Sequence, residues 1–129
     1  LGAMIFGNPE LLAQSSQIQN QIIREELAHR RDLLAETEDI FFMDLPLLFE
    51  QGYESWFDQI WLVDVTEETQ LSRLMTRNAL SQKEAEKRIA AQLSLQEKRN
   101  RADVLIDNNG PLELTQEQLR DTLQKLERR

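Results

Sequence analysis

The amino-acid sequence predicts an α/β fold with a parallel sheet. Three apolar segments that suit strands, at residues 40–45, 60–65 and 104–107, alternate with segments of helical periodicity. The strand segments are apolar on both faces, which is typical of parallel strands that helices cover on both sides. Three strands are few for such a sheet, and their edges need neighbours. We therefore expect the sheet to be incomplete within these 129 residues, with a part missing on the N-terminal side.

The first element that the sequence predicts is an amphipathic helix over residues 9–36. Asn8 followed by Pro9 matches a helix N-cap and the first helical position. Apolar side chains then recur at near-helical spacing, which indicates one long helix or two consecutive ones. They are Leu11, Leu12, Ile18, Ile22, Ile23, Leu27 and Leu34.

Residues 40–45 are expected to form the first buried strand. Asp44 interrupts this apolar run just before Pro46, which cannot continue a central strand. An acid at the carboxyl end of a parallel strand lies where open α/β sheets bind their ligands. A side chain that simply caps a turn is the alternative interpretation. The connector that follows is expected to hold one helical turn at 47–51, which Gly52 ends.

The second half of the chain repeats the alternation of strand and helix. The strand at 60–65 also carries an acid near its end, and Thr66 is a suitable cap for the helix that follows. Ser81 and Glu84 form a capping box that starts another helix. After the third strand at 104–107, a second capping box at 115–118 is expected to start the last helix.

Composition excludes several classes of function. The chain has no cysteine, so it has no disulfide framework, no thiolate nucleophile and no zinc-finger pattern. His29 is the single histidine, and the residues around it are charged, so we expect it to be solvated. The chain also lacks a signal-peptide pattern and an apolar run that could span a membrane. We therefore expect a cytoplasmic protein that has no membrane partner.

The distribution of charge points to a small anionic ligand. The chain carries a net charge of −8, which argues against nucleic acid as a partner. Residues 73–101 nevertheless hold eight Lys and Arg against three Glu, a net charge of +5, so the remainder carries −13. A basic segment in an acidic protein favours a small anion over a polymer. A solvated helical face with ion pairs within the helix is the alternative interpretation.

Six motifs, taken in order along the chain, resemble those of the dephospho-coenzyme A kinase family. They are IFGNPE (5–10), DLPLLFE (44–50), WLVDV (61–65), QLSRLMTR (70–77), RIAAQ (88–92) and ADVLIDNNG (102–110). The resemblance implies phosphorylation of the ribose 3′-hydroxyl of dephospho-CoA by ATP with Mg²⁺, the last step of coenzyme A synthesis. It also implies a P-loop NTPase-like three-layer fold, with a helical CoA-binding region and a lid.

The resemblance covers about the C-terminal two thirds of a family member and divides the chain as one partial kinase domain over residues 1–129. Residues 8–36 would belong to the CoA-binding region and residues 40–65 to the core strands. Residues 73–101 would form the lid and its flanks, and residues 102–129 the last strand and the C-terminal helix. The whole enzyme is expected to be a monomer.

The same resemblance implies the residues that bind the nucleotide. Arg73 matches the arginine that starts the lid and contacts the ATP phosphates, and Arg77 lies one helical turn further on the same face. We expect both to be catalytic, because phosphoryl transfer depends on positioning and charge neutralisation. Asn108 matches an asparagine that lies beside the adenine, and Asn109 occupies the next position of that motif. The simpler alternatives are a surface arginine paired with Glu67 or Thr69, and a turn asparagine.

The substrate side is expected to involve Asp44 and Glu50, which flank the Pro-Leu-Leu turn beside the substrate cleft. No residue is assigned to a metal. Gln19 and Asn20 stand where many members of the family have His-Pro. The resemblance assigns no contact to Gln92 or Lys98, at the lid side.

The phosphate-binding pattern Gly-x-x-x-x-Gly-Lys-[Ser/Thr] does not occur in this sequence, and neither does the Asp-x-Asp segment that follows it in the family. We therefore expect the chain to be an inactive piece of the kinase, whose open sheet edge and apolar faces drive self-association. Two alternatives remain: another small-molecule kinase of the P-loop class, or a non-catalytic CoA-binding or interaction module.

Overall fold

The structure is a computed structural model, and it describes residues 9–127. The expected cap at Asn8 lies outside the described residues. The chain divides into two compact units, Leu1–Leu45 and Pro46–Arg129, which we describe separately.

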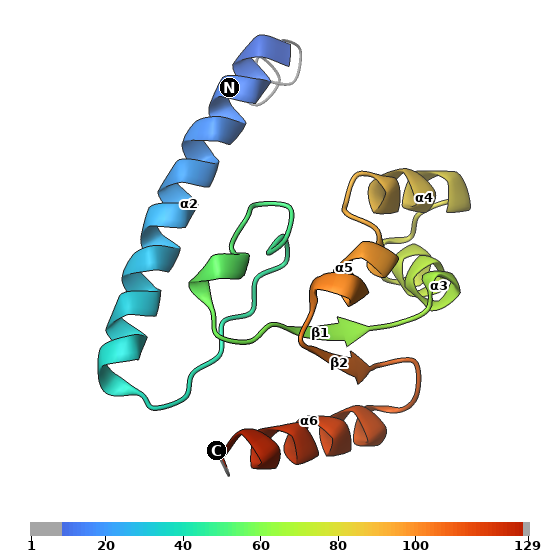
Figure 1. The fold of residues 1–129 in the computed structure, drawn as a ribbon. Coiled ribbons are helices and arrows are strands. Elements are labelled where there is room, and N and C mark those ends of the chain that lie inside the picture. Colours follow the sequence, from blue (N-terminus) through green and yellow to red (C-terminus); the bar gives the residue numbers. More distant parts are fainter. Residues whose placement is uncertain (1–8, 128–129) are drawn as a thin grey trace. The chain divides into compact units, whose positions relative to one another are not determined.

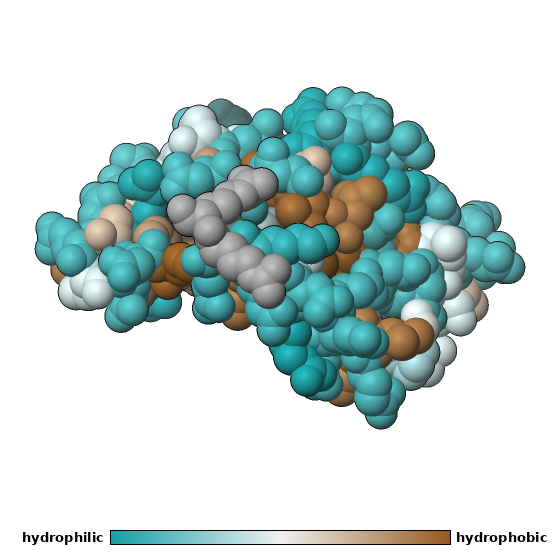
Figure 2. Space-filling view, turned by 60° about the horizontal axis from the view of Figure 1, so that its bottom comes forward, coloured by the Kyte–Doolittle hydropathy of each residue, from teal (hydrophilic) through white to brown (hydrophobic). Residues whose placement is uncertain are grey.

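In the described part of the first unit, one long helix, α2 (Pro9–Thr37), covers the segment for which the apolar spacing predicts one helix or two consecutive ones. Glu10 lies in its first turn, where the helix dipole favours a negative charge. Several apolar side chains of α2 are exposed, with Ile18 at 59%, Ile22 at 60% and Ile23 at 52%. Figure 2 shows apolar side chains at the molecular surface. In the described residues no helix has the length and hydropathy to cross a membrane.

The prediction of a strand at residues 40–45 is wrong. This segment forms no regular secondary structure and belongs to no sheet, although its side chains alternate between exposed and half-buried as those of a strand do. Ile40 is 40% exposed and Phe42 is 56% exposed. A strand needs a neighbour that bonds its backbone N–H and C=O groups, and the sheet within the described residues has two strands, neither of them in this segment.

The second unit is built on two parallel strands, β1 (Trp61–Asp64) and β2 (Val104–Asp107), as the α/β prediction requires (Figure 1). Trp61 lies beside Val104, and Asp64 lies beside Asp107. The centre of the core is Ile106, which is 1% exposed. Phe49, Tyr53 and Ala85 are also buried.

The connector before β1 forms the single helical turn that the sequence predicts. Gly52 ends it with a left-handed backbone, φ +74°. The N–H of Gly52 bonds to the carbonyl of Phe49 at 3.1 Å, and the N–H of Tyr53 bonds to the carbonyl of Leu48 at 2.9 Å. These two bonds form the Schellman motif that a glycine after a helix allows. The short helix η1 (Glu54–Trp56) follows, and the ring of Trp56 meets Tyr53 edge-on at 4.7 Å.

Three helices connect β1 to β2, and each begins at a hydroxyl cap. Thr66 caps α3 (Glu67–Asn78), as predicted, by accepting a bond from the N–H of Thr69 at 3.2 Å. Ser81 caps α4 (Gln82–Ala90) in the predicted capping box with Glu84. Ser94 caps α5 (Leu95–Arg101), a helix that the sequence did not single out. Figure 1 shows α5 beside β1 and α6 beside β2.

The last helix, α6 (Leu112–Glu127), begins earlier than the capping box at 115–118 predicts. The carbonyl of Pro111 accepts the N–H groups of Leu114 and Thr115, so the first turn forms directly after the proline. Thr115 is buried and does not cap the helix, because its hydroxyl donates to the side-chain oxygen of Asn108 at 2.8 Å.

Candidate functional site

The carboxyl ends of β1 and β2 lie beside three of the six predicted site residues, Arg73, Asn108 and Asn109. Asp64 and Asp107 end the two strands side by side. The start of α3 follows one strand, and the loop with Asn108 and Asn109 follows the other. Ligands of open α/β sheets bind at this edge.

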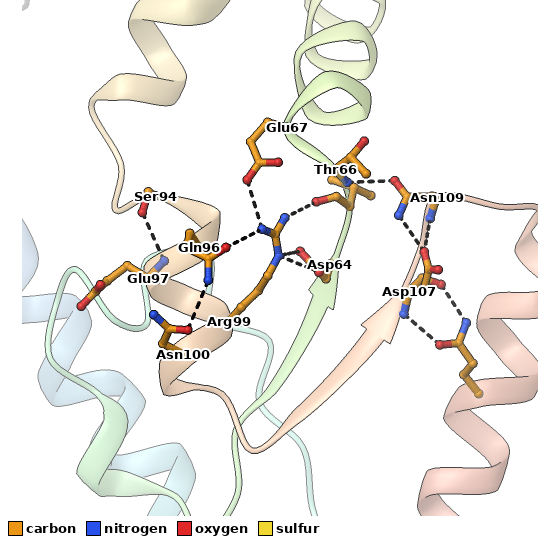
Figure 3. A network of polar contacts seen from close by, with 12 residues as sticks. Asp64, Thr66, Glu67, Ser94, Gln96, Glu97, Arg99, Asn100, Asp107 and Asn109 are labelled. Atoms are coloured by element: carbon orange, nitrogen blue, oxygen red, sulfur yellow. Dashed lines mark hydrogen bonds and ion pairs between the residues drawn. The ribbon is translucent and has the colours of Figure 1, made fainter.

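The loop after β2 is fixed by its own side chains (Figure 3). The carboxylate of Asp107 accepts the backbone N–H of Asn109 at 2.9 Å and its side-chain N–H at 2.8 Å. These bonds hold the pKa of Asp107 below its usual value. The side-chain oxygen of Asn109 accepts the N–H of Thr66 at 2.9 Å, so the loop also holds the start of α3. Gln118 of α6 exchanges two bonds of 2.8 Å with the backbone of Asp107.

Arg73 lies against this loop. Its Nη1 donates to the carbonyl of Asn108 at 2.6 Å, and its Nη2 donates to the carbonyl of Asn109 at 3.3 Å. The structure thus brings together three of the four residues predicted to contact the nucleotide. No side-chain hydrogen bond or ion pair joins Arg73 to Glu67 or Thr69, the partners in the alternative interpretation, within the described residues.

Arg77 lies one turn further along α3 and is exposed, and its Nε donates to the side chain of Asn78 at 3.2 Å. It does not join Arg73 on the loop.

The basic segment divides into two groups. Across residues 9–127, no cation in the first group lies within ion-pair distance of a carboxylate. This group comprises Arg73, Arg77, Lys83, Lys87 and Arg88. The second group is the cations of α5, and each of them is paired with at least one acid: Lys98, Arg99 and Arg101. The first group is therefore available to an external anion, whereas the second serves the protein itself.

Arg99 is a site residue that the sequence analysis missed. Its Nε donates to both carboxylate oxygens of Asp64, at 3.0 and 2.9 Å. Its Nη1 donates to Glu67 at 3.1 Å, and its Nη2 donates to the carbonyl of Val65 at 2.9 Å (Figure 3). The bonds to Asp64 and then to Glu67 raise the pKa of Arg99. The pKa of Glu67 is lowered by a backbone N–H and then by Arg99.

Glu50 holds the segment between α4 and α5. Its Oε2 accepts the ammonium of Lys98 at 3.2 Å and the N–H of Leu93 at 3.3 Å. Its Oε1 is buried and has no hydrogen-bond partner in the described part of the chain. Glu50 therefore has an internal partner in addition to its predicted place at the substrate. Asp44 belongs to the first unit, where its side chain is exposed.

The fold and the site define an α/β protein in which Arg73, paired with no carboxylate of the described residues, lies at the ligand edge of a parallel sheet, an arrangement compatible with the small-molecule kinases of the P-loop type. The comparisons with known proteins identify the family within this class. Residues 1–113 match the family model of dephospho-CoA kinase (CoaE). The chain belongs to the dephospho-CoA kinase family. This confirms the family that the six motifs predict.

Individual curated relatives belong to the same family. The dephospho-CoA kinase of Streptococcus mutans is 54% identical over 127 residues, which cover 98% of this chain and 64% of the relative. That of Streptococcus agalactiae is 53% identical over 126 residues, covering 98% and 65%. The chain thus spans a little under two thirds of the length of the curated relatives it matches.

Two solved structures share the fold. The crystal structure of TT1252 from Thermus thermophilus has a TM-score of 0.75 at 31% identity, covering 96% of this chain and 64% of that one. Dephospho-CoA kinase from Campylobacter jejuni has a TM-score of 0.72 at 26% identity, covering 97% and 62%. These likenesses confirm the predicted P-loop kinase-like fold.

Proposed function

We propose that these residues form the lid and the nucleotide-base side of a cytoplasmic dephospho-CoA kinase. The enzyme would transfer the γ-phosphoryl group of ATP to the ribose 3′-hydroxyl of dephospho-CoA and release coenzyme A. The observation that carries this proposal is the placement of Arg73 on the loop of Asn108 and Asn109, at the carboxyl end of two parallel strands. Family membership supports the choice of substrates.

Arg73 would act by exchanging partners. In this structure its guanidinium bonds to two neutral carbonyl oxygens. The oxygens of a triphosphate are ionised and attract the guanidinium charge more strongly than neutral carbonyl oxygens do, so they would compete well for the same donors. Arg77 lies one turn away and would be the second cation over the phosphates. Both would stabilise the charge that develops during transfer.

The asparagine loop would receive the adenine mainly through its backbone. The side chain of Asn108 is bonded to Thr115, and that of Asn109 is bonded to Thr66 and Asp107. Both side chains therefore shape the loop. The carbonyls of Asn108 and Asn109, which hold Arg73 in this structure, would become free to meet the base once Arg73 bonds to the phosphates. We propose that the loop recognises the adenine by the conformation of its backbone as much as by its side chains.

Mg²⁺ would accompany ATP, bound to the phosphate oxygens. Among the described residues, no group of three or more His, Cys, Asp or Glu side chains gathers in a way that could hold a metal ion. At the ligand edge, Asp64 and Asp107 are both engaged by other side chains. These residues do not form a magnesium site, and we assign no step of the reaction to the ion through them.

The remaining predicted contacts belong to the same proposal. Helix α2 would contribute to the CoA-binding region, and Asp44 and Glu50 would flank the acceptor substrate. Turnover would also require a glycine-rich phosphate loop with its lysine, a pattern that these 129 residues do not contain. The 129-residue chain by itself would therefore bind nucleotide weakly and would not turn over.

The test is steady-state kinetics of the complete gene product that contains these residues, with ATP and dephospho-CoA. We expect Arg73→Ala to lower kcat/KM for ATP about 10²–10³-fold, in line with the loss of one stabilising donor. Arg120→Ala is the matched control, because Arg120 is an exposed arginine on α6 without a carboxylate partner in the described residues. Equal kinetics of the two variants would refute the role of Arg73.

A further inference from the structure

Two carboxylates lie beside the place where the proposed function puts the phosphates of ATP. Asp64 ends β1, and Glu67 begins α3, the helix that carries Arg73. An ionised carboxylate at this edge would repel a triphosphate. Both carboxylates are held by a single guanidinium, that of Arg99 (Figure 3).

The bonds of Arg99 distinguish it from Arg73. Arg73 is exposed and donates to neutral carbonyls, which a phosphate can replace. The side chain of Arg99 is 20% exposed and that of Asp64 is 18% exposed, and two charge-assisted bonds join them. Displacing Arg99 toward a ligand would leave Asp64 unpaired and largely buried, which is unfavourable. Arg99 is thus arranged to stay where it is when an anion arrives.

Arg99 also fixes the geometry of the first turn of α3. It holds the carbonyl of Val65 and the side chain of Glu67, while Asn109 holds the N–H of Thr66 between them. The start of α3 is therefore clamped from two sides, by α5 and by the loop after β2. Arg73 lies within the next two turns of this helix, so its position depends on the clamp.

We propose that Arg99 is a positioning residue that neutralises Asp64 and fixes the start of α3, and so sets the affinity for ATP phosphates without contacting them. The inference rests on the proposed function, because it concerns the nucleotide of that same site. Helix α5 thus has a role beyond the lid, because Arg99 neutralises the carboxylates of Asp64 and Glu67 at the ligand edge.

The test is a double-mutant cycle in the complete gene product, with Arg99→Gln, Asp64→Asn and both together. Arg99→Gln exposes the charge of Asp64, and we expect it to raise KM for ATP about tenfold, with a smaller change in KM for dephospho-CoA. The increase should shrink at high salt, because exposed charges are screened. Adding Asp64→Asn removes the uncovered charge and should recover most of the lost affinity.

Arg101→Gln is the matched control. Arg101 lies on the same helix and also pairs with two acids, Glu54 and Glu97, but those acids are not at the ligand edge. A rise in KM for ATP in Arg99→Gln, without a rise in Arg101→Gln, supports the proposal that Arg99 neutralises Asp64. Arg99→Lys provides a conservative variant: it keeps the charge but cannot span Asp64, Val65 and Glu67, so an intermediate KM is expected.

Three results would overturn the inference. An unchanged KM in Arg99→Gln would show that no masking is needed. A loss that Asp64→Asn does not relieve would show that Arg99 contacts the phosphates itself. An equal loss in Arg101→Gln would point to a general weakening of α5. If Arg99→Gln does not fold, the double variant and Arg99→Lys still measure the effect. Absence of dephospho-CoA phosphorylation by the unmodified protein would instead contradict the proposed function.

Discussion

Replacing Lys98 by methionine should destabilise the second unit more than any surface substitution. The ammonium of Lys98 lies 3.2 Å from Glu50, and the two side chains are 11% and 17% exposed. Removal of one partner of a buried ion pair typically costs 3–5 kcal/mol, because the other charge remains without compensation. The residual exposure of Glu50 and its bond from Leu93 place the expected loss at about 3 kcal/mol, near the lower end of that range.

The assay is urea unfolding of the 129-residue chain, followed by tryptophan fluorescence. Trp56 and Trp61 both lie in the second unit and report on it directly. Adding Glu50→Gln to Lys98→Met removes both charges and keeps an acceptor for the N–H of Leu93. The double variant should therefore recover about 2 kcal/mol relative to Lys98→Met.

The control is Lys87→Met, since Lys87 is exposed on α4 and has no carboxylate partner in the described residues; its stability should change by less than about 0.5 kcal/mol. A loss for Lys98→Met as small as that of the control would show that the pair behaves like a surface salt bridge. Strictly additive effects of Glu50→Gln and Lys98→Met would show that the two side chains do not interact.

Three further predictions concern stability and association. The lowered pKa of Asp107 contributes stability that is present above the unfolded-state pKa of about 3.9 and is lost as the pH falls through the lower folded-state value. Urea midpoints of Asp107→Asn should therefore depend less on pH below about 4 than those of the unmodified chain, and parallel curves would contradict this. Gly52→Ala should lower the free energy of unfolding in urea by about 1 kcal/mol. Gly52 has φ +74° and no atom lies within 4 Å of an added Cβ, so backbone strain alone acts. An unchanged urea midpoint would refute that reasoning. The exposed Ile18, Ile22 and Ile23 of α2 should make the 129-residue chain self-associate in light scattering, and a monomer at every concentration would count against this.

The sequence predicted the elements that local rules determine. Hydroxyl caps at Thr66 and Ser81 and the glycine at 52 each depend on neighbouring residues, and the structure has all three where they were expected. The prediction of a strand at 40–45 was wrong, because a strand depends on a partner strand elsewhere in the chain. The predicted start of α6 was wrong, because the hydroxyl of Thr115 bonds to the side chain of Asn108 and does not cap the helix, which the local sequence pattern does not show.

The candidate site likewise contains residues that the sequence predicts and residues whose contacts depend on distant parts of the chain. Arg73, Asn108 and Asn109 could be placed together, because the carboxyl ends of parallel strands meet at one edge and family motifs mark these positions. The bonds of Arg99 to Asp64 and of Lys98 to Glu50 join residues 35 and 48 positions apart. In the sequence, these two cations are indistinguishable from the other Lys and Arg of the basic segment. Their partners follow from the packing of α5 against β1 and the connector, which the residues themselves do not reveal.

The proposed function requires the site to serve dephospho-CoA and ATP. The most direct measurement is to incubate the complete gene product with ATP, Mg²⁺ and either dephospho-CoA, nucleoside monophosphates or shikimate, and to identify the products by mass spectrometry and ³¹P NMR. We expect coenzyme A, with the new phosphate on the ribose 3′-oxygen, and no turnover of the other acceptors. Phosphorylation of a nucleoside monophosphate or shikimate in place of dephospho-CoA would contradict it, and binding of dephospho-CoA without any product would indicate a non-catalytic CoA-binding module.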